Sequence, residues 1–232
     1  MTPSTPPGRL IGAGRTADVY EIDADRVLRR YRIPFDVGPE AGLMTYLRQA
    51  GFAVPEVFDA DGSDLVMARI RGTDMLADLA ARPWRAARHA RTLARLHDQL
   101  HEIAAPPGLV PQFGAGTHVM HLGLHPGNVM LTNDGPVVID WSNGAAGPPG
   151  ADVAMSTLIM RSSEVDSLPA AVRVAAGLVR GLLVRRFEAV VSADPRPYLT
   201  QVAEFRLQDP NVRPNEADRL REIIRAAHRP GR

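Results

Sequence analysis

The chain has 232 residues, of which 45% are apolar and 23% charged, a composition that can bury a sizeable core and excludes an intrinsically disordered chain. A formal net charge of +1 gives no global reason to expect nucleic acid or an anionic membrane as a partner. Cysteine is absent, which excludes disulfides and thiolate metal sites and fits a reducing cytoplasm. No apolar run approaches the roughly 20 residues that span a bilayer, so we expect a cytoplasmic protein without a membrane partner.

The first part of the chain has the pattern of antiparallel strands. Apolar and polar residues alternate over 19–22 and over 27–31 around a turn at 23–25, which predicts a β-hairpin. A helix is predicted from Pro39 to Gln49, because Pro39 suits a first turn and Gly51 suits the stop. Two short strands are expected to follow on either side of a turn at 59–62.

The second part of the chain is mainly helical. A long helix is predicted from Pro83 to Ile103, then a loop rich in Pro and Gly, a β-rich centre over 118–141, and amphipathic helices from Ala151 onward. This order of elements predicts an α+β fold in two parts, residues 1–71 and 72–232.

Gly12 and Gly14 lie in a glycine-rich turn that continues to Thr16. The motif matches both a dinucleotide-binding fingerprint and the glycine-rich loop of kinases. The dinucleotide alternative, an oxidoreductase, requires a helix directly after the glycines, whereas residues 18–22 have the pattern of a strand. A strand–loop–strand arrangement favours a kinase loop over ATP phosphates, and an ordinary tight turn remains the other interpretation.

Arg29 stands on a predicted strand where a kinase carries a phosphate-binding lysine, and Glu40 opens the next helix. All 27 basic residues of the chain are arginine, so Arg29 is interpretable as a replacement for that lysine. Two plainer alternatives are an exposed strand arginine and a glutamate favoured by the helix dipole.

The most specific pattern runs from His121 to Asn128 as His-Leu-Gly-Leu-His-Pro-Gly-Asn and is followed by Ile139-Asp140-Trp141. Two short predicted strands around an Asp-Gly turn separate Asn128 from Asp140 and are expected to bring them to the same end of a hairpin. Amide and carboxylate oxygens are ligands that Mg²⁺ accepts, so these two residues are candidate metal ligands.

This segment resembles the catalytic loop of the aminoglycoside phosphotransferase and choline kinase-like family, whose pattern is His-x-Asp-Leu-His-Pro-Gly-Asn followed by Ile-Asp-Trp or Ile-Asp-Phe. The resemblance implies a two-lobed protein-kinase-like fold, with a small N-terminal antiparallel sheet lobe and a larger, mainly helical C-terminal lobe. It implies that Asn128 and Asp140 hold Mg²⁺, that His121 and His125 brace the loop, and that Asp152 is structural. The residues expected to bind ATP are Gly12, Gly14, Thr16, Arg29, Glu40, Met67, Ala68 and Arg69.

Gly123 departs from this pattern, because the family places there the aspartate that accepts the proton of the substrate hydroxyl. Loss of a general base costs about 10²–10⁴-fold in rate, so we expect an impaired phosphotransferase acting on a hydroxyl of a small molecule. The alternative is a pseudokinase that binds nucleotide or a partner and transfers nothing. Metal binding by the three histidines His118, His121 and His125 is a further alternative.

The acceptor is less well defined by the sequence. A polycationic aminoglycoside calls for a pocket rimmed by carboxylates, yet residues 151–232 carry 13 arginines against 10 acidic residues. A neutral or modestly charged hydroxyl compound is therefore expected as readily as an aminoglycoside. The acidic residues considered for a cationic acceptor are Glu164, Asp166, Glu188 and Glu204.

Overall fold

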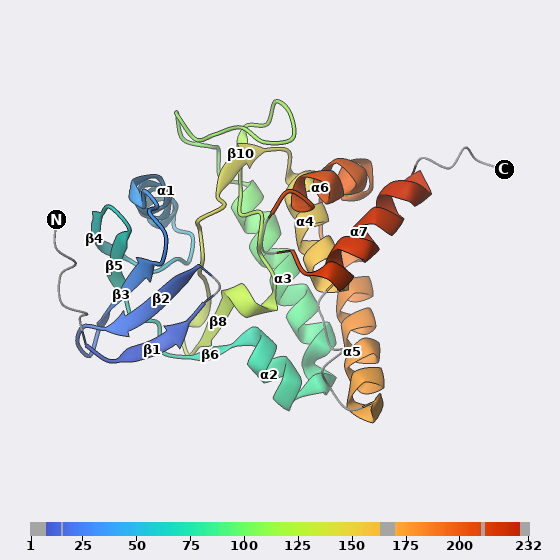
Figure 1. Ribbon diagram of the computed structural model, residues 1–232, viewed down its shortest axis with the longest axis horizontal. Helices are drawn as coiled ribbons and strands as arrows, with labels where there is room; N and C mark the ends of the chain where they lie inside the picture. The colour runs from blue at the N-terminus through green and yellow to red at the C-terminus, as the bar shows by residue number, and fades with distance from the viewer. Residues whose placement is uncertain (1–7, 15, 163–169, 210–211, 228–232) are drawn as a thin grey trace. The chain divides into compact units, whose positions relative to one another are not determined.

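The computed structural model describes residues 8–14, 16–162, 170–209 and 212–227 (Figure 1). The chain forms two compact units. The first consists of Met1–Gly72 and Met130–Ser142, and the second of Thr73–Val129 and Asn143–Arg232. Segment 130–142 thus groups with the N-terminal residues, while the expected division between residues 71 and 72 stays a prediction.

The first unit contains a five-stranded antiparallel sheet, as expected, with the strand order β1-β2-β3-β5-β4. The central strand β3 buries Val27, Leu28 and Tyr31, which makes it the strand most shielded from water. The turn that leads into it is closed by Asp23, whose Oδ1 accepts from two backbone N–H groups. The strands are β1 (Leu10–Ala13), β2 (Ala17–Glu21), β3 (Arg26–Tyr31), β4 (Val57–Asp61) and β5 (Asp64–Ala68).

Helix α1 (Gly38–Gln49) covers the bounds predicted for it to within one residue. Leu43, Met44 and Leu47 form its buried face. The helix ends in a Schellman motif, because Gly51 adopts φ 83° and the next residue donates its N–H back to the carbonyl of Leu47 at 2.9 Å. A glycine is favoured at this left-handed position, which is why the helix stops where the sequence indicated.

The hairpin β8 (Val129–Thr132) and β9 (Gly135–Val138) leads into the Ile139-Asp140-Trp141 segment. Val138 donates its N–H to the carbonyl of Ala53 at 2.9 Å. Trp141 is fully buried and makes an edge-to-face contact with Phe52, with 5.8 Å between the ring centroids. The buried ring anchors the chain at the residue directly after Asp140.

The second unit is mainly helical, as expected (Figure 1). Helix α4 is buried almost all round, which is typical of a helix at the centre of a bundle. The long helix expected from Pro83 begins later, because residues Pro83–Arg85 form a 3₁₀ turn before α3. The helices are α2 (Met75–Ala81), α3 (Ala86–His101), α4 (Pro149–Ser162), α5 (Ala170–Glu188), α6 (Leu199–Arg206) and α7 (Pro214–Ala227).

The short strands of this unit, β7 (His118–Met120) and β10 (Ala145–Gly147), pair antiparallel. Strand β7 leads into the loop that carries the His-Leu-Gly-Leu-His-Pro-Gly-Asn pattern, which ends in a 3₁₀ turn at Pro126–Asn128 directly before β8. Among the helices of the described ranges, none is long and apolar enough to cross a membrane.

Candidate functional site

In the first unit, the side chain of Arg29 joins two carboxylates. Arg29 is only 8% exposed, and its Nη1 donates to Glu40 Oε1 at 2.9 Å while its Nη2 donates to Asp140 Oδ1 at 2.5 Å. Its Cζ lies 4.9 Å from the ring centroid of Tyr31, in a cation–π contact. The alternative that Arg29 is an exposed strand residue is therefore wrong, and its side chain forms a buried ion pair with Glu40.

Glu40 is buried and accepts from three groups. Besides Arg29, the Tyr31 hydroxyl donates to Oε2 at 2.7 Å, and the Trp141 backbone N–H donates to Oε1 at 3.1 Å. Burial raises the pKa of Glu40, although Arg29 and Tyr31 act in the opposite direction. Tyr31 was not among the predicted residues, but its position two residues after Arg29 on one strand face was a usable signal.

Asp140 has an unusual backbone conformation for a residue with a side chain. Its φ is 68°, in the left-handed region, and its side chain is 41% exposed. Oδ1 also accepts from the Ser142 hydroxyl at 3.2 Å. Sparsely populated backbone conformations cluster at functional sites, and the buried Trp141 follows Asp140 directly in the chain.

The glycine-rich turn of the first unit is a tight hairpin connection. Gly14 donates its N–H to the Ala17 carbonyl at 2.8 Å, and a Cβ on Gly14 would lie 3.0 Å from that oxygen. Gly12 pairs with Val19, and the Thr16 carbonyl accepts from Arg32. Strand β2 begins at Ala17, so the helix that a dinucleotide site requires is replaced by a strand.

The stretch Met67–Arg69 lies at the end of β5, an interior strand of the sheet. Met67 pairs with Val27 across β3 and β5, and Ala68 donates its backbone N–H to the carbonyl of Glu56 at 2.8 Å. Arg69 donates its N–H to the carbonyl of Asp25 at 2.8 Å. A nucleotide base at this stretch would therefore have to use other backbone groups, and base binding by these residues stays a prediction.

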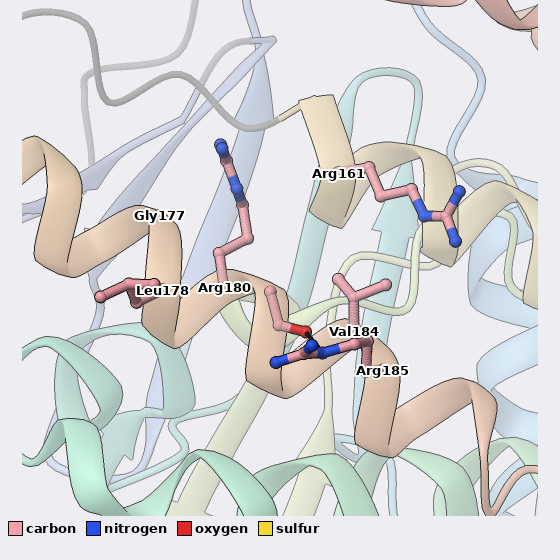
Figure 2. A pocket seen from close by; sticks show the side chains of 7 residues that line it. Arg161, Gly177, Leu178, Arg180, Val184 and Arg185 are labelled. Carbon is pink, nitrogen blue, oxygen red and sulfur yellow. Dashed lines mark hydrogen bonds between the residues drawn. The ribbon is translucent and has the colours of Figure 1, made fainter.

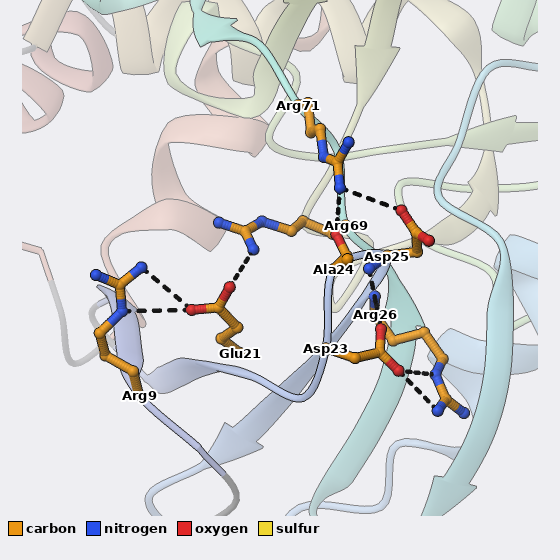
Figure 3. A network of polar contacts seen from close by, with 8 residues as sticks. All are labelled: Arg9, Glu21, Asp23, Ala24, Asp25, Arg26, Arg69 and Arg71. Carbon is orange, nitrogen blue, oxygen red and sulfur yellow. Dashed lines mark hydrogen bonds and ion pairs between the residues drawn. The ribbon is translucent and has the colours of Figure 1, made fainter.

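The side chain of Arg69 belongs to a surface network of arginines and carboxylates (Figure 3). It donates to Glu21, which also accepts from Arg9 at 3.1 Å. Arg71 reaches the Ala24 carbonyl at 2.6 Å. Exposed pairs of this kind are each worth about 0–1 kcal/mol, so the network tethers the chain after β5 to the β2–β3 turn without adding much stability.

In the second unit, the loop around Gly123 keeps an ordered arrangement without a side chain at that position. Asn128 Nδ2 donates to the Gly123 carbonyl at 2.9 Å, and His125 Nδ1 accepts from the Gly127 N–H at 3.1 Å. A Cβ built on Gly123 would lie 3.4 Å from His121 Nδ1 and 3.8 Å from Asn128 Nδ2, which are ordinary contacts. The loop therefore accommodates a Cβ at residue 123.

Asp152 holds the backbone of the same loop. It is fully buried and accepts from the N–H groups of Leu122 at 2.7 Å and His121 at 3.2 Å, and from His101 Nε2 at 3.0 Å. Burial alone would raise the pKa of Asp152, but the hydrogen bond from His101 and the nearby histidines lower it overall. Leu122 has φ 54°, so Asp152 secures a second left-handed residue, next to Gly123. This geometry agrees with the structural role expected of Asp152.

His97 lies in the core beside this aspartate. Its Nδ1–H donates to the Leu93 carbonyl at 2.9 Å, and its Nε2 lies 2.9 Å from the Ser156 hydroxyl, from which it accepts when neutral. Burial lowers the pKa of His97 to about 4. Neither His97 nor its contact with Ser156 was predicted, because a histidine on an apolar helix face gives no sign of its partner.

We expect the folded state to lose stability as the pH falls from about 6.5 to 4, because His97 takes up a proton in the unfolded chain but stays neutral in the core. His97 accounts for a full loss of about 3 kcal/mol in the free energy of unfolding. This loss is reached near the pKa of His97 in the folded state and stays constant at lower pH. The free energy of unfolding, measured in urea across this pH range, should depend less steeply on pH for His97→Gln than for the wild type. Equal slopes for the two proteins would contradict the assignment of this pH dependence to His97.

The alternative of a three-histidine metal site finds no support in the part of the chain that the structure describes. No group of three or more His, Asp and Glu residues in these ranges is arranged to hold a metal ion. His118 lies on β7, whereas the ring of His125 caps the 3₁₀ turn through the Gly127 N–H.

A surface groove of about 500 Å³ follows α5 near the end of α4. Its lining includes Arg161, Arg180 and Arg185, and Figure 2 shows their guanidinium groups directed apart in this view. Arg161 donates to both carboxylate oxygens of Glu188, at 2.7 and 3.0 Å. Glu188 is thus already paired. Of the other acidic candidates, Glu204 is exposed on α6, and Glu164 and Asp166 lie outside the described residues.

An antiparallel sheet with a buried Arg–Glu pair and a helical unit with the His-Leu-Gly-Leu-His-Pro-Gly-Asn loop together make up a protein-kinase-like fold. Residues 7–115 and 99–188 match the phosphotransferase enzyme family (APH), and the chain belongs to this family. A search of curated proteins finds no match.

Solved structures share the fold at low sequence identity. A thermostable mutant of aminoglycoside phosphotransferase APH(4)-Ia, in a ternary complex with AMP-PNP and hygromycin B, is 16% identical with a TM-score of 0.64, covering 96% of this chain and 94% of its own. ADP-bound APH(2'')-Ib is 12% identical with a TM-score of 0.61, covering 97% and 87%. A choline/ethanolamine kinase family protein from Mesorhizobium loti is 16% identical with a TM-score of 0.59, covering 99% and 90%.

Proposed function

We propose that this chain is an ATP- and Mg²⁺-dependent phosphotransferase that acts on a hydroxyl of a small molecule, with a rate reduced by the missing base at Gly123. The observation that carries the proposal is the loop around Gly123. It has hydrogen bonds to Asn128 and Asp152 and accommodates a Cβ at residue 123. Membership of the phosphotransferase family supports the reaction class.

In this proposal the first unit binds the nucleotide. The turn with Gly12, Gly14 and Thr16 lies over the phosphates, Arg29 supplies positive charge to them, and Met67–Arg69 lies beside the base. Structures of family members with ADP and AMP-PNP support the use of a nucleotide. ATP is therefore the expected phosphoryl donor.

Asn128 and Asp140 are the proposed Mg²⁺ ligands. The amide nitrogen of Asn128 donates to the Gly123 carbonyl, so its amide oxygen points away from that bond. Asp140 provides a part-exposed carboxylate. Hard oxygen donors of this kind fit Mg²⁺. When bound, the ion would neutralise charge on the phosphates during transfer.

A pseudokinase is the second candidate, and Gly123 is the observation that favours it. A protein that binds nucleotide without transfer has no use for a base. The ordered Asn128 amide and the strained Asp140 favour the enzyme instead, because a site that has lost its chemistry does not need metal ligands held in place.

We propose a neutral or modestly charged hydroxyl compound as the acceptor and the cytoplasm as the location. Structures similar to this chain contain hygromycin B, gentamicin or streptomycin. In this chain, Glu188 is engaged by Arg161, and residues 151–232 carry more arginines than acidic residues. Both features disfavour a polycationic acceptor.

The test is transfer of the γ-phosphoryl group from labelled ATP to pools of hydroxyl compounds. Sugars, amino alcohols and nucleosides form one pool and aminoglycosides another, and each is incubated with the wild type and with Gly123→Asp. Labelled product in the neutral pool, stronger with the variant, is the expected result. ATP binding without transfer by either protein to any pool would favour the pseudokinase.

A further inference from the structure

Arg29 already places a positive charge at the carboxylate proposed to hold the metal. Its Nη2 donates to Asp140 Oδ1 at 2.5 Å while its Nη1 donates to Glu40 Oε1 at 2.9 Å, so one guanidinium serves both carboxylates with separate nitrogens. These two bonds use two of the five N–H groups of the side chain. The remaining N–H groups are a fixed set of donors suited to phosphate oxygens.

The surroundings hold this guanidinium in position. Glu40 is fixed by the Tyr31 hydroxyl and the Trp141 N–H as well as by Arg29, and the Tyr31 ring lies against the guanidinium. Guanidinium groups stay protonated in proteins, so this buried side chain keeps its positive charge. Arg29 cannot leave Asp140 without giving up several contacts.

A lysine at this position would behave differently. Its ammonium is a compact, strongly hydrated charge on a flexible stem, whereas guanidinium is a planar fork that binds two partners at once and is more weakly hydrated. A divalent ion at Asp140 has to displace Nη2 from Oδ1 or share the carboxylate with it, and sharing would bring three positive charges together. A lysine would yield the carboxylate to the ion more readily.

We propose that the guanidinium of Arg29 provides a permanent positive charge in the nucleotide site. It neutralises Asp140 and donates hydrogen bonds to the polyphosphate, so that ATP binds with little dependence on a divalent metal. The inference rests on the proposed nucleotide site and concerns binding only. It distinguishes this chain from a site with a lysine at the same position, where metal and nucleotide are expected to bind together.

Calorimetric titration with ATP, in buffer with EDTA and in buffer with Mg²⁺, tests this inference. For the wild type we expect dissociation constants within about threefold of each other in the two buffers. For Arg29→Lys, binding in EDTA should be weaker than in Mg²⁺ by about tenfold or more, a difference of about 1.4 kcal/mol. Mg²⁺ alone should also bind Arg29→Lys more tightly than the wild type.

Arg30→Lys is the matched control. Arg30 follows Arg29 on β3 but pairs with Asp64, at 2.7 and 2.5 Å, and is expected to give the wild-type result in both buffers. Circular dichroism and thermal unfolding establish that the variants are folded, and the wild-type comparison needs no variant at all.

Two outcomes would overturn the inference alone. One is wild-type ATP binding that is weaker in EDTA than in Mg²⁺ by about tenfold or more. The other is an equal dependence of ATP binding on Mg²⁺ in the wild type and in Arg29→Lys. Absence of ATP binding in both buffers would overturn the proposed nucleotide site and the role of Arg29 with it. The two failures are distinguishable, because only the second removes binding altogether.

Discussion

Replacing Gly123 by aspartate is expected to raise the rate of phosphoryl transfer by about 10²–10⁴-fold, the range that a positioned general base contributes. An aspartate here would accept the proton of the acceptor hydroxyl and orient it toward the phosphoryl group. Positioning and charge carry most of the catalysis of phosphoryl transfer, so the wild type should keep a low rate that the variant increases.

The local geometry supports this gain of function. The new Cβ meets no atom closer than 3.4 Å, and Gly123 does not adopt the left-handed backbone conformation that disfavours other residues. Asn128 Nδ2 lies 3.8 Å from the Cβ position and is already ordered by its bond to the Gly123 carbonyl. The Cβ of an aspartate at residue 123 therefore fits the existing backbone of the loop.

Gly123→Asn is the control for this experiment, because it adds a side chain of equal size without a base. Labelled ATP and the acceptor pools provide the assay for both variants. A gain with aspartate and none with asparagine would support the proposed role of residue 123. Equal rates for the wild type and both variants would contradict it.

Replacing Asp152 by alanine is expected to lower the free energy of unfolding by about 3–5 kcal/mol. Removal of one partner from a buried charged network leaves the remaining buried groups unpaired. The N–H groups of His121 and Leu122 and the Nε2 of His101 would lose their acceptor inside the core. The left-handed conformation of Leu122 would also lose the contact that secures it.

Asp98→Ala is the matched control in the same unit. Asp98 lies on α3 and accepts from the Ser192 N–H at 3.0 Å, so its loss should cost about 1 kcal/mol. Urea unfolding monitored by circular dichroism measures both variants. Similar losses for Asp98→Ala and Asp152→Ala would contradict the account of Asp152 as the residue that organises the loop.

Local patterns in the sequence predicted the elements that depend on neighbours along the chain. The alternation over 27–31, the proline and glycine at the ends of α1, and the Asp-Gly turn of the β8–β9 hairpin each report local backbone geometry. The pairing of Arg29 with Glu40 could be anticipated as well, because a strand and the next helix supply the two partners. The 3₁₀ turn before α3 was missed, since proline suits the first turn of either helix type.

Partners far apart in the chain were not predictable in the same way. The residues of the Arg29–Asp140 bond are separated by 111 positions, and those of the Trp141–Glu40 bond by 101. Nor did any sequence pattern indicate that His97 contacts Ser156 on another helix. These contacts depend on how elements pack, and periodicity indicates which face is buried but not which polar group it meets.

Equilibrium dialysis with labelled ATP, applied to the wild type and Gly123→Asp in parallel, tests the central claim most directly. We predict saturable binding with similar affinity for both proteins, because residue 123 belongs to the proposed catalytic loop and not to the proposed nucleotide contacts. The account would be contradicted if neither protein showed saturable binding at about 10 mM ATP. This concentration is well above a dissociation constant of about 1 mM, which corresponds to a binding free energy of about −4 kcal/mol.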